Sequence, residues 1–505
     1  MAHLVTNLIE AARDHPDRPA VKSDDTVLTY GDLLAAVGRV AGMLRARGLQ
    51  PGDRIGLVLP NVLAFPILFY GSLMAGCVAI PLNPLLKNRE IEYCLRDSGA
   101  KLVVAWERAG GASVKAAAAV GAQTLLVAAE GPDASQLGDS SPLSNPVERA
   151  DDDDAVLLYS SGITGKPMGA QLTHANLSSN AATSAQILGA TGQDIMMGCL
   201  PLFHVFGLTA GLNASVAAKA CLTLIPRFHP AKALEVIARD QVTIFEGVPT
   251  MYSALLRTPN RESYDVSTLR TCITGGSAMP VEVMKAFEDA FGCIVLEGYG
   301  LSETSPVASF NHADAERRPG SIGTPVTGME MKLVDEQGHD IQEGSQDAGE
   351  IAIRGEGVMK GYWQRPVETG RAIPDGWFRS GDLATRDEDG YYFIVGRKKD
   401  MIIRAGYNVY PREIEDALHE HEAVAEAVVF GIKHPDLGEE VGAVIVLEAG
   451  AHVSVEELKS FAKERVAAYK YPRHVWVVDA LPKDSAGNVL RREVRPPETL
   501  SRDSS

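Results

Sequence analysis

The stretch LLYSSGITGKPMGAQLTH, Leu157–His174, joins a short apolar segment to a loop rich in glycine and hydroxyl residues. The apolar segment, Ala155–Tyr159, is typical of a buried strand. Glycines let backbone N–H groups approach anionic oxygens, and hydroxyl groups add further donors. The spacing is not that of a Walker loop, because Pro167 follows directly after Gly165 and Lys166. Taken alone, the stretch fits a nucleotide-phosphate loop or a mobile polar loop equally well.

Strand and helix patterns alternate on both sides of this loop, over about the first 390 residues. Thr29 and Asp32 form a capping-box variant before an apolar helical face that runs from Leu33 to Leu44, and Gly48 ends the pattern. Further strands are expected at Ile55–Leu59, Leu102–Ala105, Thr124–Val127, Cys221–Ile225, Thr243–Glu246, Thr271–Ile273 and Ile294–Glu297. This alternation predicts an α/β fold of parallel, doubly wound sheets with ligand loops at the strand ends.

One apolar segment, Val62–Leu82, runs 21 residues without a charge and is long enough to span a bilayer. It is divided by Pro66, Gly71, Gly76 and Pro81. Buried elements of α/β proteins are apolar on all sides. A core helix followed by a strand is therefore expected, and no transmembrane segment.

The pattern changes after about Gly349, where short strands are joined by charged turns. These patterns predict a small α+β unit of about a hundred residues, joined near Gly396–Asp400. Its expected helices and strands are Pro411–Glu420, Val455–Val466, Ala427–Ile432 and Ala443–Leu447.

The composition excludes several classes of partner. The chain has 505 residues and a formal net charge of −17 at pH 7, which disfavours nucleic acid because its binding needs clustered Lys and Arg. The six cysteines lie far apart and form no CxxC motif, so reduced thiols are expected rather than a zinc site. The N-terminus lacks the pattern of a secretory signal, which favours a cytoplasmic location.

Further motifs follow the loop in a fixed order. They are LPLFHVFG (Leu200–Gly207), ITGGSAMP (Ile273–Pro280), EGYGLSET (Glu297–Thr304), GEIAIRG (Gly349–Gly355), GWFRSGDLATRDEDGYYFIVGRKKDMI (Gly376–Ile402), NVYPREIE (Asn408–Glu415) and LPKDSAGNVLRREV (Leu481–Val494). Together they closely resemble the adenylate-forming superfamily of acyl-CoA synthetases, peptide-synthetase adenylation domains and luciferases. The resemblance covers nearly the whole chain.

The resemblance implies a fold and a two-step reaction. Residues 1–397 would form a large region of packed αβ subdomains with a small β-barrel-like part, and residues 398–505 a small, mobile α+β domain. In complete members a carboxylate first attacks the α-phosphate of ATP, which gives acyl-AMP and pyrophosphate. The C-terminal domain then rotates, and a thiol displaces AMP.

The resemblance also assigns residues to the nucleotide. Tyr299 would offer a flat face to adenine, Asp382 would accept hydrogen bonds from the ribose hydroxyls, and Glu303 would hold Mg²⁺, since a hard cation prefers carboxylate oxygen. The whole nucleotide set implied in this way is Ser161, Thr164, Gly275, Gly276, Ser277, Glu297, Gly298, Tyr299, Gly300, Ser302, Asp382, Ile394 and Arg397.

The remaining roles concern the acyl group, the thiol and the moving domain. His204 and Phe206 would border the acyl pocket together with Val248 and Gly276. Lys399 matches the hinge, and Gly406 matches the loop that lines the pantetheine tunnel after rotation. The candidate catalytic residues are His204, Glu303, Lys399, Gly406 and Asn488.

Three positions depart from the family pattern. Ile163 stands where the phosphate loop usually has a hydroxyl residue, and Met168 stands where it has a lysine. Asn488 replaces the second lysine of the C-terminal motif, which in the family bridges the attacking carboxylate and the α-phosphate. One ammonium about 4 Å from an anion contributes on the order of 4 kcal/mol at an effective dielectric near 20. That corresponds to roughly a thousandfold in rate.

All three departures fall on groups that serve the reaction of ATP. The leading hypothesis is therefore an acyl-CoA ligase that is poor or inactive in adenylation and competent in thioesterification, like the family's non-adenylating variant. It would use acyl-AMP and coenzyme A, with ATP doubtful. One alternative is a complete ATP-dependent acyl-CoA synthetase in which Lys166, Lys483, Arg491 or Arg492 replaces the missing cation. Another is a non-catalytic protein that binds acyl-adenylates.

The acyl group itself is specified only by chemical class. The segment VPTMY, Val248–Tyr252, is mostly apolar or aromatic, which favours a hydrophobic or bulky carboxylic acid. A separate adenylating enzyme would supply the acyl-adenylate. The pantetheine arm of either coenzyme A or a carrier protein would fit the same tunnel.

Overall fold

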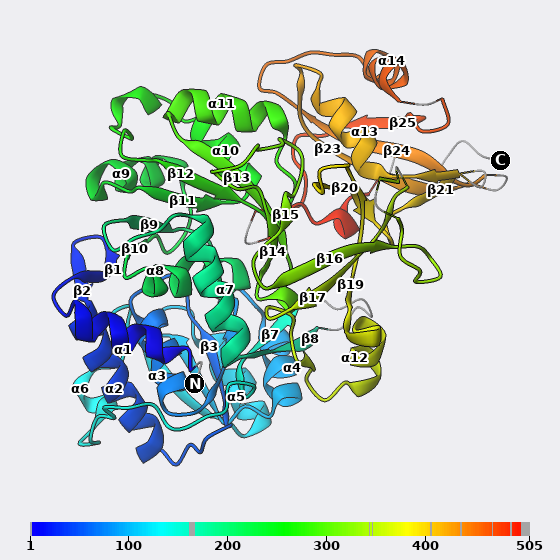
Figure 1. Ribbon diagram of the computed structural model, residues 1–505. Coiled ribbons are helices and arrows are strands. Elements are labelled where there is room, and N and C mark those ends of the chain that lie inside the picture. The colour runs from blue at the N-terminus through cyan, green and yellow to red at the C-terminus, as the bar shows by residue number, and fades with distance from the viewer. Residues whose placement is uncertain are drawn as a thin grey trace.

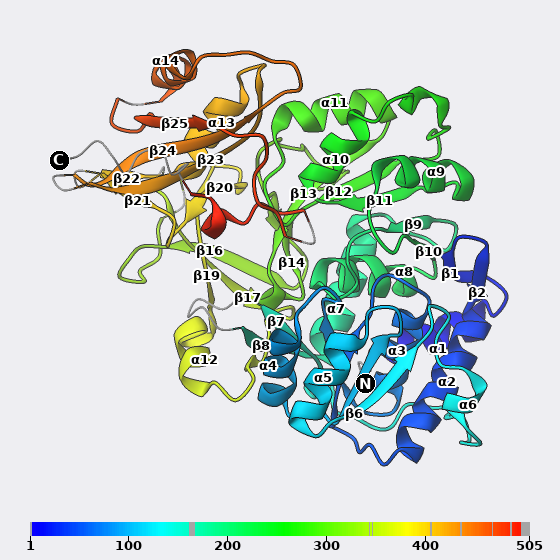
Figure 2. The same ribbon diagram turned by 180° about the vertical axis from the view of Figure 1, so that it is seen from behind.

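The computed structural model describes residues 3–160, 167–342, 344–345, 347–404, 407–434, 437–466, 468–484 and 487–495. Two large sheets and their helices make up most of the N-terminal region, and a smaller C-terminal part lies beside it (Figure 1). Seen from behind, the red segment that follows the last strand extends from the C-terminal part towards the N-terminal region (Figure 2).

A seven-stranded sheet forms one layer, in the order β18-β8-β7-β4-β3-β5-β6. Its strands are β3 (Arg54–Val58), β4 (Val78–Leu82), β5 (Leu102–Trp106), β6 (Gln123–Val127), β7 (Asp154–Ser160), β8 (Met168–Thr173) and β18 (Gly361–Tyr362). The helices between its strands are α3 (Ala64–Met74), α4 (Asn88–Ser98), α5 (Gly111–Val120) and α6 (Ala134–Leu137).

A nine-stranded sheet forms the second layer, in the order β15-β14-β13-β12-β11-β9-β10-β1-β2. Its strands are β1 (Pro19–Ser23), β2 (Thr26–Thr29), β9 (Ile195–Gly198), β10 (Cys221–Leu224), β11 (Ile244–Gly247), β12 (Thr271–Thr274), β13 (Ile294–Gly300), β14 (Val307–Phe310) and β15 (Thr324–Pro325). Its helical segments are α1 (Val5–Asp14), α2 (Tyr30–Ala46), α7 (His174–Ile187), the π-helix η1 (Phe206–Asn213), α8 (Ala214–Ala217), α9 (Pro230–Asp240), α10 (Pro249–Leu256), α11 (Val281–Phe291) and the 3₁₀ turns η2 (Arg261–Ser263) and η3 (Ser302–Thr304). Residues of both sheets contribute to one large apolar core.

Two smaller sheets complete the chain. The first is antiparallel and contains β16 (Met329–Val334), β17 (Gly349–Gly355), β19 (Phe378–Arg386) and β20 (Tyr392–Arg397), with α12 (Pro366–Ala372) and η4 (Pro374–Gly376) before β19. The C-terminal sheet contains β21 (Ile402–Arg404), β22 (Tyr407–Val409), β23 (Val424–His434), β24 (Gly438–Leu447) and β25 (His474–Val477), with α13 (Pro411–His419), α14 (Val455–Arg465) and the last turn η5 (Arg491–Glu493). The short turn between β20 and β21 connects the two.

The sequence-based elements are confirmed, and one expectation needs correction. Helix α2 begins behind the expected capping box, in which Thr29 Oγ1 accepts a hydrogen bond from the Asp32 backbone N–H at 3.1 Å. The apolar segment Val62–Leu82 contains α3 and β4, and no helix among the described residues is long and apolar enough to cross a membrane. The two large sheets, however, are mixed rather than parallel. Strands joined by short loops, such as β7 and β8, pair antiparallel because a parallel pair needs a long crossover connection.

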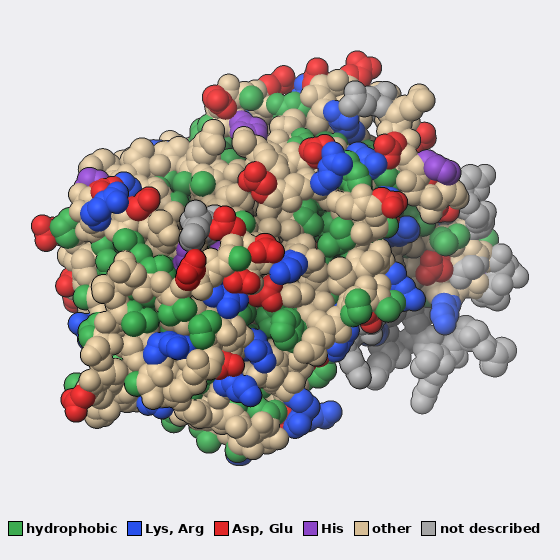
Figure 3. Space-filling view, turned by 60° about the horizontal axis from the view of Figure 1, so that its bottom comes forward, with side chains coloured by type: hydrophobic (Ala, Val, Ile, Leu, Met, Phe, Trp, Pro, Cys, Tyr) green, Lys and Arg blue, Asp and Glu red, His purple; other side chains and the backbone are tan. Residues whose placement is uncertain are grey.

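The outer surface carries both signs of charge. Acidic and basic side chains are interspersed on the face shown in Figure 3. The described side chains on that face thus form none of the broad basic areas that nucleic acid binding requires.

Candidate active site

The predicted acyl pocket meets the C-terminal part of the chain at Gly276. A Cβ atom at Gly276 would lie 3.6 Å from Val248 Cγ1 and 3.7 Å from Asn488 Oδ1. The neighbouring Gly487 carbonyl accepts a hydrogen bond from Thr250 Oγ1 at 3.3 Å. Asn488 therefore lies beside two of the predicted acyl-pocket residues, although it is more than 200 residues away from them along the chain.

Phe206 is the first residue of η1, and His204 lies two residues before it. Part of the His204 side chain is exposed to solvent, and the neighbouring protein atoms that bury its imidazole lower the pKa of that ring. The Asp484 carboxylate partly offsets the lowering of this pKa, so Asp484 lies near His204. The ring of Phe206 is 3.3 Å from the position of a Cβ atom at Gly275, which places it against the glycine pair.

Three residues of the predicted nucleotide site are connected by a hydrogen bond and an ion pair. They are Tyr299, Asp382 and Arg397. The Tyr299 hydroxyl donates to Asp382 Oδ2 at 2.6 Å, and Arg397 Nε lies 3.0 Å from Asp382 Oδ1. Antiparallel pairing of β19 with β20 sets Asp382 opposite Arg397. Burial raises the pKa of Asp382, although Arg397 and Tyr299 act in the opposite direction. A buried carboxylate held in this way still has lone pairs for ribose hydroxyls.

Two glycines of strand β13 lie so close to neighbouring atoms that a side chain would not fit at either position. A Cβ atom at Gly298 would lie 2.0 Å from the Phe310 ring, and one at Gly300 would lie 2.0 Å from the Pro306 carbonyl oxygen. Glu297 precedes them and is 2% exposed. Its Oε1 accepts a hydrogen bond from the Met279 backbone N–H at 2.9 Å, and burial raises its pKa to about 7.

Glu303 is the predicted Mg²⁺ ligand and lies in η3. Its Oε1 accepts a hydrogen bond from the Tyr362 hydroxyl at 2.9 Å, and Tyr362 belongs to the strand that pairs with β8, directly after the loop. The described residues contain no group of three or more His, Cys, Asp or Glu side chains that could hold a metal. A single carboxylate still fits Mg²⁺ bound mainly by phosphate oxygens and water, as this ion prefers.

Met168 is the first residue of β8, and its side chain faces inward. It is 6% exposed and belongs to the large core. A thioether suits this place, whereas an ammonium would have to extend out of the core to avoid burial.

The predicted hinge lies in the turn after β20. Burial lowers the pKa of Lys399, and the nearby Arg397 and Arg492 lower it further. Ile394 is half-buried on β20 opposite Ala384. Ser277 is exposed beside Gly276, and Ser302 is half-buried at the start of η3. Ser161, Thr164 and Gly406, as well as Ile163 and Lys166, lie outside the described residues.

Two contacts of the site were not expected from the sequence. Asp484 accepts hydrogen bonds from the backbone N–H of Asn488 at 2.9 Å and from its side-chain Nδ2 at 3.3 Å, and so orients it. Thr250 holds the same turn from the N-terminal side. The spacing of Asp484 and Asn488, four residues apart in a glycine-containing segment, is a signal for such a turn.

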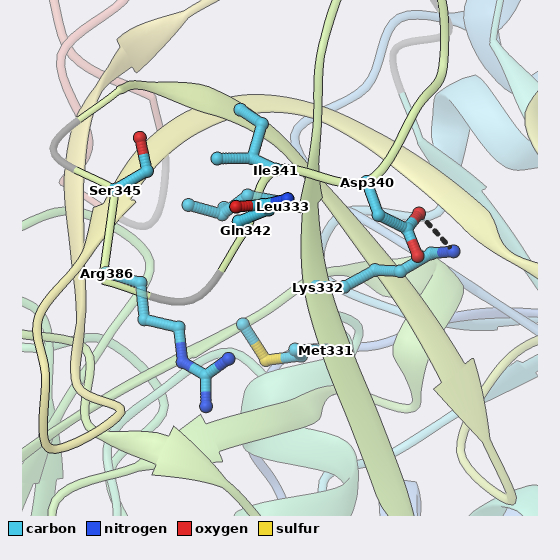
Figure 4. Close-up of a pocket in the computed structure, with 8 residues that line it drawn as sticks. All are labelled: Met331, Lys332, Leu333, Asp340, Ile341, Gln342, Ser345 and Arg386. Atoms are coloured by element: carbon cyan, nitrogen blue, oxygen red, sulfur yellow. Dashed lines mark ion pairs between the residues drawn. The ribbon is translucent and has the colours of Figure 1, made fainter.

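A separate hollow lies on the small antiparallel sheet. It is lined by residues of β16, β19 and the segment between β16 and β17, including Lys332, Asp340 and Arg386 (Figure 4). Lys332 Nζ and Asp340 Oδ1 form an ion pair of 2.6 Å across one side. None of the predicted site residues lines this hollow.

Comparison with known proteins shows the family of this chain. Residues 8–363 match the family described as AMP-binding enzyme, and residues 413–488 match the AMP-binding enzyme C-terminal domain. The chain belongs to the AMP-binding enzyme family. It is 36% identical over 533 residues to the long-chain-fatty-acid–CoA ligase of Bacillus subtilis, covering 97% of this chain and 94% of that protein. It is also 36% identical over 488 residues to a feruloyl-CoA synthase of Amycolatopsis, covering 96% and 97% of the two chains.

A solved structure matches the fold closely. The crystal structure of ATP-bound MatB from Rhodopseudomonas palustris superposes with a TM-score of 0.91, at 34% identity, and the match covers 97% of each chain. These matches confirm the expected fold and the class of adenylate-forming acyl-CoA ligases. They do not bear out the doubt about ATP, because this relative binds it.

Proposed function

We propose that this AMP-binding enzyme transfers an acyl group from an acyl-adenylate to the thiol of coenzyme A, and that it forms the adenylate itself slowly. The thiol sulfur attacks the acyl carbonyl carbon, the bond from that carbon to the phosphate oxygen breaks, and AMP leaves. The thiol proton passes to solvent. ATP can bind the same nucleotide site without reacting at a useful rate.

The position of Asn488 carries this proposal. Its side chain reaches the junction of Gly276 and Val248, where a carboxylate and the α-phosphate would meet. Asn488 Oδ1 is buried and has no hydrogen-bond partner among the described residues. An amide brings no positive charge to two anions, and fixed charge is often the largest catalytic term. The Asp484 carboxylate beside it adds negative charge at the same place.

Two of the described cations that were candidates to replace the lysine form ion pairs with glutamates of the C-terminal part. Lys483 Nζ lies 2.9 Å from Glu426 Oε1. Arg491 forms an ion pair with Glu415 and also donates to the Val429 carbonyl oxygen at 3.3 Å. Arg492 lies near Lys399, the predicted hinge residue, and lowers its pKa. The ion pairs of Lys483 and Arg491 support a deficit of positive charge beside the predicted acyl pocket.

The residues that serve the second step are compatible with this function. Asp382 and Arg397 form an ion pair and would hold the AMP portion, and His204, Phe206 and Val248 would border the acyl group. Acyl-AMP is already activated, so its reaction with a thiol makes less demand on a cation than the attack of a carboxylate on ATP does.

A complete ATP-dependent acyl-CoA synthetase is the second candidate. The specific observation in its favour is the close match to a relative that was solved with ATP bound. The two candidates differ in the rate of pyrophosphate release, because only the second forms acyl-AMP efficiently.

The substitution Asn488→Lys tests the proposal. With ATP, Mg²⁺ and benzoate, cinnamate or decanoate, the variant should release pyrophosphate roughly a hundred to a thousand times faster than the unsubstituted protein, because an ammonium now faces both anions. The matched variant Asn488→Gln keeps the amide and should show no gain. An unchanged rate in the lysine variant would contradict the role assigned to Asn488. Nucleotide binding without either product would favour the third hypothesis, a non-catalytic binding protein.

A further inference from the structure

A buried carboxyl group in β11 lacks the partners that such a group normally has. Glu246 is 1% exposed, and its Oε1 has no hydrogen-bond partner among the described residues. Burial raises its pKa to about 8. An unpartnered buried carboxyl group costs stability, so its presence in an otherwise apolar strand calls for a functional reason.

Glu246 lies on the strand that leads to the predicted acyl pocket. Val248, which borders that pocket, follows two residues later and keeps an extended backbone, with φ −95° and ψ 157°. Alternate residues of an extended segment point to the same face and are about 7 Å apart. Glu246 is therefore about 7 Å from Val248 along the chain, close to the residues of the predicted acyl pocket.

The π-helix η1 begins at Phe206, a residue of the predicted acyl pocket, and passes beside Glu246. Phe206 lies next to Gly275, and Gly211 lies five residues further along η1, where a Cβ atom would be 3.0 Å from Glu246 Oε2. The missing side chain at Gly211 leaves room at the carboxyl group. Segments of π-helix occur frequently at functional sites.

Two polar atoms of η1 also lack a hydrogen-bond partner among the described residues. They are Thr209 Oγ1 and Asn213 Nδ2, and both are buried. The inner part of η1 thus carries further buried polar atoms, although Asn213 Oδ1 accepts a hydrogen bond from the Tyr70 hydroxyl at 2.8 Å. A purely hydrophobic acyl group beside Glu246 would leave Glu246 Oε1 unpaired, which is costly.

We propose that Glu246 forms the inner end of the acyl pocket and hydrogen-bonds a hydroxyl group at the far end of the acyl group. The preferred substrates are then acids with an apolar body and a terminal hydroxyl, such as para-hydroxylated aromatic acids or ω-hydroxy fatty acids. This inference deepens the proposed function and rests on it, since it concerns the same acyl pocket.

A hydroxyl group matches this carboxyl better than a charged group does. A carboxyl group whose pKa is about 8 is mostly protonated at pH 7, so it both donates and accepts a hydrogen bond. A hydroxyl group has the same two capacities. A carboxylate at the far end of the acyl group would bring a charge without a counterion into a buried space, which burial strongly opposes.

The test uses binding, so that it does not depend on catalysis. Acyl-sulfamoyl adenosines, which imitate acyl-AMP and do not react, are prepared as three pairs that differ in one hydroxyl group. The pairs are benzoyl and 4-hydroxybenzoyl, cinnamoyl and 4-hydroxycinnamoyl, and decanoyl and 10-hydroxydecanoyl. Calorimetry gives the ratio of dissociation constants within each pair for the unsubstituted protein, Glu246→Gln and Glu246→Leu.

The unsubstituted protein should bind the hydroxylated member of at least one pair about 10–100 times more tightly, because the plain member leaves a buried group unpaired. Glu246→Gln should keep most of this preference, and Glu246→Leu should lose it while binding the plain member at least as well. The proposal is overturned if no pair differs in the unsubstituted protein, or if Glu246→Leu keeps the preference. Either result leaves the proposed function standing, since thioester formation is measured separately.

Discussion

Two side chains with a buried oxygen that is unpaired among the described residues carry the proposals made for this chain. We propose that Asn488 brings an amide to the point where two anions would meet, and that Glu246 brings a carboxyl group to the inner end of the acyl pocket. These two oxygens, without hydrogen-bond partners in the described part of the chain, characterise the candidate site. So do the hydrogen bond and the ion pair that connect Asp382 with Tyr299 and Arg397.

The pKa of Glu246 predicts a pH dependence of stability. Burial raises this pKa to about 8 in the folded chain, from about 4.5 in the unfolded chain. The folded state then holds an extra proton between these values, so the contribution of Glu246 to the free energy of unfolding falls as pH rises from about 4.5 to 8. Glu246→Gln removes this fall, and its melting temperature relative to the unsubstituted protein should be higher at pH 8 than at pH 5.

Differential scanning calorimetry at the two pH values checks this prediction. Glu336→Gln, at an exposed position, serves as the matched control and should shift melting little at either pH. An equal shift of Glu246→Gln at pH 5 and pH 8 would show that burial does not raise the pKa of Glu246 in the folded chain.

Among the elements, β13 contains glycines in close contact with neighbouring atoms. A Cβ atom at Gly300 would lie 2.0 Å from the Pro306 carbonyl oxygen, which belongs to the backbone and cannot move aside alone. Gly300→Ala should lower the free energy of unfolding by about 1–3 kcal/mol through overpacking, and should weaken AMP binding because Tyr299 is its neighbour. Urea unfolding and AMP titration measure both effects.

A glycine in open space provides the comparison for β13. A Cβ atom at Gly111, in α5, would meet nothing within 4 Å. Gly111→Ala should therefore leave AMP binding unchanged and stabilise the chain slightly, since alanine favours helix. Similar destabilisation by both substitutions would mean that the close contact at Gly300 has no special weight.

The sequence predicts elements well where local patterns decide them. Helix α2 follows its capping box, and the apolar strands β3, β5 and β12 begin within one residue of their expected positions. The antiparallel edges depend on which strand lies next in space, and η1 depends on tertiary packing, so neither has a local signal. The nucleotide residues are predicted from motifs and stay a prediction. Glu246 could not be predicted, because burial of a lone acidic residue is not visible in a strand pattern.

At the scale of the whole molecule, the structure shows one arrangement of its two parts. Thr250 and Gly487 join them by a hydrogen bond, and Asn488 is thereby held at the acyl pocket. The family resemblance implies that the C-terminal domain rotates about Lys399 before the thiol attacks. We therefore expect that fixing this arrangement stops thioester formation.

A disulfide between positions 250 and 487 tests this expectation. A Cβ atom at Gly487 would lie 3.9 Å from Thr250 Cβ, which is within the range for a disulfide. The six native cysteines are buried, so the pair Thr250→Cys and Gly487→Cys should cross-link selectively. The oxidised double variant should lose thioester formation from acyl-AMP, and a reductant should restore it.

Each single variant, with and without oxidant, controls for strain at position 487, where φ is +88°. Thioester formation by the cross-linked protein at the rate of the reduced protein would show that rotation is not needed.

The most direct test of the central claim compares the two half-reactions in one preparation of the unsubstituted protein. Pyrophosphate release from ATP and cinnamate or 4-hydroxycinnamate is measured beside thioester formation from the matching acyl-AMP and coenzyme A. We predict that thioester formation is faster by roughly a thousandfold, the factor that one missing ammonium represents. Pyrophosphate release at a rate equal to thioester formation would contradict the proposed division between the two half-reactions.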